Sequence, residues 1–107
     1  MARRGGTKKT DAAEIPEGFE WYAAKNRRNV RDHDGVGFME AHTVSSDPFA
    51  ITVPDEGHSE DEDREWTLGM STRNRVLVVS HTQRGENIRI ISARKANASR
   101  IKQYNQG

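Results

Sequence analysis

Apolar and polar residues recur with two different periods along the chain, and the change of period separates expected helices from expected strands. Residues 19–21 alternate apolar and polar, which predicts a short strand or an extended lead-in. From residue 23 to about residue 32 the pattern becomes helical, and glycines end this helix. Residues 38–44 predict a second, shorter helix before an Asp-Pro pair. Residues spaced by four lie along one side of the first helix: Trp21, Lys25, Asn29 and His33.

The second half of the chain predicts four strands and a helix. Residues 49–53 and 64–70 are rich in β-branched and aromatic residues, with some alternation. Residues 75–82 are apolar on both faces in their middle, so this strand is expected near the centre of the sheet. Residues 88–93 form the last strand, and short connections favour an antiparallel meander. A final helix is expected at residues 98–103.

This order of elements predicts an α+β fold. It has a short N-terminal strand and two helices, then an antiparallel sheet of about four strands and a C-terminal helix that Asn97 caps. The length of 107 residues fits one domain. The first residues are basic and contain no apolar anchor, which predicts a flexible basic tail at residues 1–17 and a folded domain at residues 18–107.

Charge is strongly segregated along the chain, although the formal net charge is only +1. Residues 1–10 carry +4 and residues 11–31 carry 0, whereas residues 32–65 carry −10 and residues 66–107 carry +7. Such asymmetry favours a basic face that binds a polyanion and an acidic segment with another role. The alternative is that the fold interleaves the two segments and their fields cancel.

Composition and motifs exclude several classes of protein. The chain has no cysteine, and therefore no disulfide, thiolate nucleophile or Cys-bearing zinc site. It has no HExxH motif, no GxxxxGK[ST] or GxGxxG loop and no apolar run that could span a membrane. Its basic first residues are not followed by the apolar stretch of a secretory signal, so we do not expect one. We expect a cytoplasmic protein without a cofactor or metal, and we interpret the acidic run around His58 as a solvated loop.

The remaining reactive residues suit the cleavage of RNA. A 2′-hydroxyl attacks its own phosphate without a metal when one group takes its proton, a cation neutralises the phosphorane and another group protonates the leaving 5′-oxygen. Arginine fits the second role because its guanidinium binds phosphate oxygens in pairs. Arg89, Arg94, His81 and Tyr104 are expected to converge at one end of the sheet. On composition alone, such arginines are more often surface residues than catalysts, and His81 more often caps a strand.

An ordered set of motifs from about Phe19 to Tyr104 gives a more specific indication. Its pieces are Trp21-x3-Lys25-x3-Asn29-x3-His33, Gly35-Val36-x-Phe38-x-Glu40-Ala41, Asp47-Pro48, Asp55-x2-His58-Ser59-x2-Glu62-x-Arg64, Gly69-x-Ser71, Arg75-Val76-Leu77-Val78-Val79-x-His81-Thr82 and Ile88-Arg89-Ile90-Ile91-Ser92-Ala93-Arg94-Lys95-Ala96. In these motifs the chain resembles the BrnT toxins of bacterial type II toxin–antitoxin modules.

The resemblance implies a compact RelE-like ribonuclease fold and a metal-independent endoribonuclease that arrests growth when it is free. It also implies a BrnA-like antitoxin that covers the toxin in a heteromer, expected to be a heterotetramer, and that supplies all contacts with operator DNA. An antitoxin that mimics RNA would be acidic and would dock on the basic face, with the acidic segment of the toxin outside the active groove.

Three departures from the family pattern bear on these expectations. Asp34 is inserted between His33 and Gly35, which changes the end of the first helix. Tyr22 stands where the family usually has an Asp N-cap. Arg100 stands where the last helix often carries Glu. The alternatives are therefore a catalytically weak RelE-like corepressor of its antitoxin and an RNA-binding module.

Five residues of the matching motifs are predicted to be catalytic. Arg94 is the first candidate for the cation that stabilises the phosphorane, and a salt bridge to the acidic segment is its alternative. His81 is a candidate proton shuttle, or it makes a structural hydrogen bond. Glu62 and Arg64 are a candidate base and a substrate-binding cation, or one ion pair. His58 is a second candidate shuttle, or it bonds within its loop.

Contacts with RNA outside the reacting phosphate are predicted for other residues. On the first helix, Lys25 is a candidate, while His33 is interpreted as ending the helix. Three further candidates lie on the last strand and helix: Arg89, Lys95 and Tyr104. The large aromatic residues interpreted as core are Trp21, Phe38 and Trp66.

Overall fold

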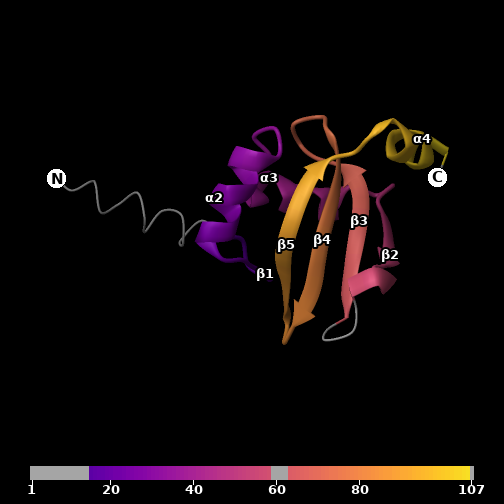
Figure 1. Cartoon of the computed structure of the whole chain (residues 1–107). Coiled ribbons are helices and arrows are strands. Elements are labelled where there is room, and N and C mark those ends of the chain that lie inside the picture. Colours follow the sequence, from indigo (N-terminus) through magenta and orange to yellow (C-terminus); the bar gives the residue numbers. More distant parts are fainter. Residues whose placement is uncertain (1–14, 59–62, 107) are drawn as a thin grey trace.

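The computed structural model describes residues 15–58 and 63–106 of the chain. One five-stranded sheet forms its centre, with two helices beside strand β5 and a third near β3 and β2 at the other side (Figure 1). In chain order the elements are β1 (Phe19–Glu20), α2 (Ala23–Asp32), α3 (Phe38–His42), the 3₁₀ turn η1 (Thr43–Ser46), β2 (Ile51–Pro54), the 3₁₀ turn η2 (Glu56–His58), β3 (Arg64–Met70), β4 (Val76–Arg84), β5 (Asn87–Lys95) and α4 (Ala98–Gln106).

The sheet has the strand order β1-β5-β4-β3-β2. Strands β2 to β5 form the expected antiparallel meander, and β4 lies at the centre. The short strand β1 pairs with β5 in the parallel direction, with Phe19 opposite Ile88, and so adds an edge strand at the start of the chain. The predicted α+β class and the order of elements are confirmed.

The boundaries of several elements differ from the sequence prediction. The second helix is shorter than predicted, because α3 ends at His42 and the chain continues as the 3₁₀ turn η1. The last helix is longer than predicted and ends at Gln106. Asn97 caps it as expected, since its side-chain oxygen accepts a hydrogen bond from the Arg100 backbone N–H (2.9 Å).

The main hydrophobic core lies between one face of the sheet and the layer of α2, α3 and η1. Phe38 is fully buried there, and Trp21 packs edge-on against it with 5.9 Å between ring centroids. The buried core residues are Val36, Phe38, Ala41, Val44, Leu77, Val79, Ile90 and Ala93. The prediction of Trp66 as a core residue is wrong: its side chain lies half-buried on the opposite face of the sheet.

Asn29 joins helix α2 to the edge of the sheet. Its side-chain amide donates to the backbone oxygens of Val36 (2.8 Å) and Ala93 (2.7 Å). Its carbonyl oxygen accepts from the backbone N–H of Ala93 (3.1 Å). Strand β1 pairs with β5 only at Ile88 and Arg89, so Asn29 takes the place of a strand partner farther along β5.

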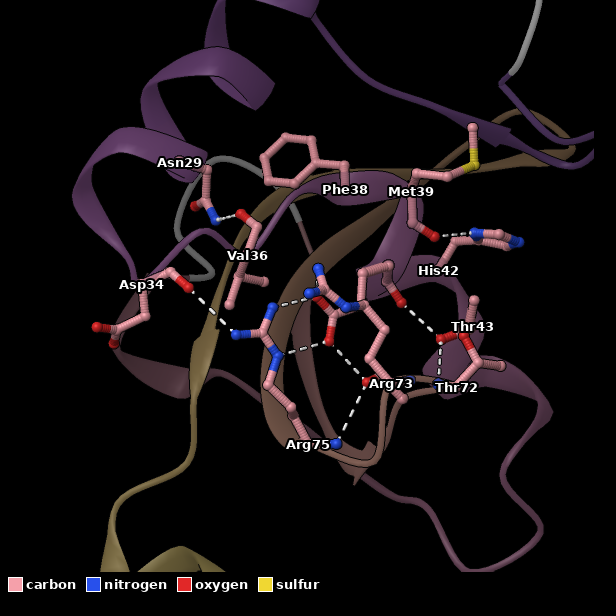
Figure 2. Close-up of polar contacts among 12 residues, drawn as sticks. Asn29, Asp34, Val36, Phe38, Met39, His42, Thr43, Thr72, Arg73 and Arg75 are labelled. Carbon is pink, nitrogen blue, oxygen red and sulfur yellow. Dashed lines mark hydrogen bonds and ion pairs between the residues drawn. The ribbon is translucent and has the colours of Figure 1, made fainter.

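Glu40 is the centre of a buried ion-pair network near the start of β4. Arg75 grips its carboxylate with two nitrogens, one of them at 3.0 Å, and also donates to the Asp34 backbone oxygen (3.1 Å; Figure 2). The Ser71 hydroxyl donates to the same carboxylate (2.7 Å), and Arg73 lies 3.8 Å from it. These bonds, with Arg75 first, hold the pKa of Glu40 below its usual value despite burial.

We expect Glu40→Gln to remove a pH-dependent part of the stability. A carboxylate with a lowered folded pKa stabilises the protein at neutral pH, and this contribution is lost as the pH falls through that pKa. The variant loses about 3 kcal/mol at pH 7 because Arg75 loses its charged partner, and less as the pH falls. Urea unfolding at several pH values measures this. Glu86→Gln, at an exposed turn, is the control; equal losses at pH 7 and below pH 4 would contradict the prediction.

Candidate functional site

The face of the sheet that the main core leaves free carries three arginines around one hollow. Arg64 comes from β3, Arg94 from β5 and Arg100 from α4, so three separate elements supply the cations. The hollow has a volume of about 380 Å³. The residues that line it are Asp55, Arg64, Trp66, Val78, Ser80, Ile91, Ser92, Arg94 and Arg100. We call this the arginine hollow.

A β-bulge in β5 directs Arg94 toward this face. Ser80 pairs with Ser92, but the next residue of β4 pairs with Ile90, so Ile91 is an extra residue in β5. Before the bulge, Ile88 and Ile90 point to the helix side of the sheet; after it, the odd-numbered residue Ala93 does so. Arg94 therefore lies on the same face as its β4 partner.

Arg100 is held in place by stacking on Trp66. Its guanidinium carbon lies 4.3 Å from the centre of the Trp66 ring, and its Nη1 donates to Gln103 (3.0 Å). Helix α4 has no buried residue and is fixed by Tyr104, whose hydroxyl donates to Asp47 (2.6 Å). This bond raises the pKa of Tyr104 above its usual value.

The charge of the arginine hollow is mainly positive. Asp55 is the one acid among its described lining residues, against three arginines. Arg94 is exposed and makes no ion pair within the part of the chain that the structure describes. A polyanion can therefore reach its guanidinium without first breaking a described ion pair.

His81 lies on the opposite face of the sheet from Arg64 and Arg94. Its Nε2 shares a hydrogen bond with the Thr67 hydroxyl (2.8 Å), and its Nδ1 lies 4.0 Å from Glu65. Burial lowers the pKa of His81, and the negative charge of Glu65 partly opposes this. The imidazole lines a separate cavity of about 290 Å³ under α3, so the fold does not bring it to the arginines.

The other predicted site residues do not line the arginine hollow or lie outside the described residues. Arg89 is ion-paired with Glu20 (3.5 Å) and lies 5.0 Å from the centre of the Tyr22 ring. Lys95 is exposed and pairs with Leu77 of β4. Both residues belong to the alternate positions whose side chains lie on the helix side of the sheet. Lys25 lines a second hollow, beside α2. Tyr104 holds α4 as described above. The side chain of His58 and the whole of Glu62 lie outside the described residues, as does most of the predicted basic tail.

Sequence reasoning missed several lining residues of the arginine hollow. Trp66 was assigned to the core because a strand tryptophan in a small core is usually buried. Arg100 entered only as a departure from the family pattern, although it lies six residues after Arg94, across one helix start. Asp55 is the first residue of the motif that ends at Arg64, so its place in that motif could have marked it as a candidate site residue.

Neither a metal centre nor a membrane-spanning helix is found among the described residues. No three His, Asp or Glu side chains gather there in a way that could hold a metal ion. None of the helices described is both long and apolar enough to cross a membrane.

Comparisons with solved structures and with protein families identify the fold and the family of this chain. A 1.1 Å crystal structure of the ribonuclease toxin BrnT from Brucella abortus has a similar fold, with a TM-score of 0.57 at 21% sequence identity. The match covers 74% of this chain and 95% of the Brucella chain. No curated protein sequence matches the chain significantly. The family model for BrnT, the ribonuclease toxin of type II toxin–antitoxin systems, matches residues 21–99. Because that match spans well over half of the chain, the protein belongs to the BrnT family of ribonuclease toxins.

Proposed function

We propose that this toxin cleaves RNA in the arginine hollow, without a metal ion, by attack of a ribose 2′-hydroxyl on the neighbouring phosphate. The observation that carries the proposal is the convergence of Arg64, Arg94 and Arg100 from three elements on one open face. The phosphorane formed by this attack carries more negative charge than the starting phosphate. Guanidinium groups already in place around it lower the barrier without reorganisation during the reaction.

Arg94 is proposed to make the main contact with the reacting phosphate. It is exposed, and within the described residues its guanidinium has no ion-pair partner, so both of its donor pairs are available. Arg100 is held by the Trp66 ring and brings a second fork from the helix. A base of the substrate can stack on this guanidinium plane, as bases do on arginine in other RNA-binding proteins.

Proton transfer is assigned to the segment of residues 55–64, of which Asp55 and Arg64 line the hollow. The attacking 2′-oxygen forms a bond to phosphorus, its proton passes to a carboxylate, and the bond from phosphorus to the 5′-oxygen breaks as that oxygen takes up a proton. Asp55 is the described carboxylate that lines the hollow. Glu62 and His58 remain proposals from the same segment, whereas His81 is set aside because it faces the other side of the sheet.

Membership of a type II toxin–antitoxin family means that the toxin has an antitoxin partner. We infer that this antitoxin is BrnA-like and acidic, that it covers the arginine hollow in a heterotetramer, and that operator DNA is bound through it alone. The positive charge of the hollow supports an acidic partner. The site of action is then the cytoplasm, where RNA and antitoxin are found together.

The first experiment mixes purified, antitoxin-free toxin with cellular RNA in excess EDTA. We expect cleavage to continue, with 2′,3′-cyclic phosphate at the new 3′ ends, because the nucleophile belongs to the RNA itself. RNA with 2′-O-methyl groups throughout should remain intact, since its 2′-oxygen has no proton to lose. Equimolar antitoxin should stop the reaction. Loss of cleavage in EDTA that Mg²⁺ restores, or new ends with a 5′-phosphate, would refute the mechanism.

The corepressor alternative is favoured by one observation. Asp55 is the single acid among the described lining residues, and Arg100 brings a further cation to the hollow instead of a carboxylate. A toxin without an effective proton acceptor would still bind its antitoxin. Intact RNA after incubation with toxin that binds the antitoxin tightly would support this alternative.

A further inference from the structure

A second hollow lies on the other side of strand β5, beside helix α2. Its volume is about 210 Å³. The residues that line it are Lys25, Arg28, Asn29, Asp32, His33, Ile91 and Ser92. We call it the α2 hollow. Of these residues, Lys25 is the one that the sequence predicts to contact RNA.

The two hollows adjoin at the bulge of β5. Ile91 and Ser92 line both of them, so the hollows meet along this stretch of the strand. Ser92 lies two residues before Arg94 on the same strand face, which corresponds to about 7 Å. A chain bound at Arg94 therefore reaches the α2 hollow within a short distance.

The α2 hollow offers cations without using them in the fold. Lys25 and Arg28 are one helical turn apart on α2, and neither makes an ion pair within the described parts of the chain. Asn29 beneath them is occupied by its bonds to β5 and Val36. Asp32 is the one acid among the described lining residues, and its charge is balanced by Arg31 (3.0 Å).

We propose that a single-stranded RNA substrate continues from the arginine hollow, over Ile91 and Ser92, into the α2 hollow, where Lys25 and Arg28 bind its flanking phosphates. This rests on the proposed site of cleavage. The substrate class is a single strand because its path bends around a sheet edge, which a flexible strand can follow and an A-form duplex cannot. The toxin then recognises a segment of several nucleotides instead of one phosphate.

The test compares binding of 2′-O-methyl RNAs of three nucleotides and of about twelve nucleotides, measured by fluorescence anisotropy on the antitoxin-free toxin. These RNAs cannot be cleaved by their own 2′-oxygens, so binding is read apart from chemistry. In Lys25→Ala/Arg28→Ala we expect the Kd of the longer RNA to rise about 10-fold or more. The Kd of the trinucleotide should change less than about 2-fold.

Two further variants make the result specific. Arg27→Ala/Lys102→Ala removes the same charge from exposed positions of α2 and α4 outside both hollows, and it should leave both Kd values within about 2-fold. Asp32→Asn should tighten binding of the longer RNA about 2- to 3-fold, because it removes a repulsive charge. A gain in affinity cannot come from a damaged fold. The salt slope should fall by about 1.4 in Lys25→Ala/Arg28→Ala, about 0.7 for each lost phosphate.

The outcomes separate this proposal from the proposed function. Equal weakening by the two double variants, or equal weakening for the two RNA lengths, overturns the RNA path. If natural RNA is cleaved in EDTA but Lys25 and Arg28 do not affect binding, only the path is wrong. If the longer RNA needs Lys25 and Arg28 but natural RNA is never cleaved, the path stands and the catalytic proposal fails.

Discussion

Arg94→Ala is expected to lower the kcat for RNA cleavage by about 10²- to 10³-fold, with a smaller change in KM. The guanidinium of Arg94 contributes most when negative charge develops on the phosphorane, so its loss affects the transition state more than the bound substrate. Because the side chain is exposed and makes no ion pair in the described structure, truncation should leave the fold intact. Initial rates in EDTA, together with thermal unfolding of the same preparations, measure both effects.

Matched variants show whether the loss of activity is specific to an arginine at position 94. Arg84→Ala removes an exposed arginine at the β4–β5 turn, outside both hollows, and should cleave at the wild-type rate. Arg94→Lys keeps the charge but loses the planar fork, and should recover only part of the activity. Full activity of Arg94→Ala would place the reacting phosphate elsewhere, and equal activity of Arg94→Lys and wild type would reduce the role of Arg94 to charge alone.

Asn29→Ala is expected to destabilise the protein by about 3–4 kcal/mol. The substitution leaves both the N–H and the carbonyl of Ala93 without their partner in a buried position, and it removes the bond to the Val36 oxygen. It also opens a cavity between α2 and β5. Equilibrium urea unfolding monitored by circular dichroism measures the loss.

The same helix offers a control of the same residue type. Asn26 makes one described bond, in which its side-chain oxygen accepts from the Phe38 backbone N–H (2.7 Å). Asn26→Ala should therefore lose about 1 kcal/mol. Similar losses for the two variants would mean that the contacts between α2 and β5 do not depend on Asn29.

The helices and strands could be predicted from the sequence, whereas the contacts between them could be predicted only in part. Alternation and helical spacing located the meander, both N-terminal helices and the cap at Asn97, because these depend on neighbouring residues. Asn29 was recognised as part of one helix side, yet its role as a partner for β5 depends on a residue 64 positions away. Long-range contacts of this kind leave no local pattern.

The candidate site was predicted in part. Arg64 and Arg94 came from the family motifs, and the structure places both around one hollow. His81 was grouped with them because it lies near the end of a neighbouring strand, but the pleat directs it to the other face. The stack of Arg100 on Trp66 was beyond sequence reasoning, since it depends on how α4 returns to β3.

Because side chains alternate along β5, the face on which Arg94 lies depends on how many residues separate it from Ile90, and the bulge at Ile91 is part of that count. If the same residues formed a regular strand without the bulge, the alternation set by Ile88 and Ile90 would carry Arg94 to the apolar side, and Ala93 would face away from the core. Losing the extra residue would place Ser92 directly after Ile90 in a regular ladder and would preserve the face of Arg94. Losing two residues between positions 88 and 92 would instead turn Arg94 to the apolar side and bury a charge. In this part of β5, the loss of one residue should therefore be tolerated better during evolution than the loss of two.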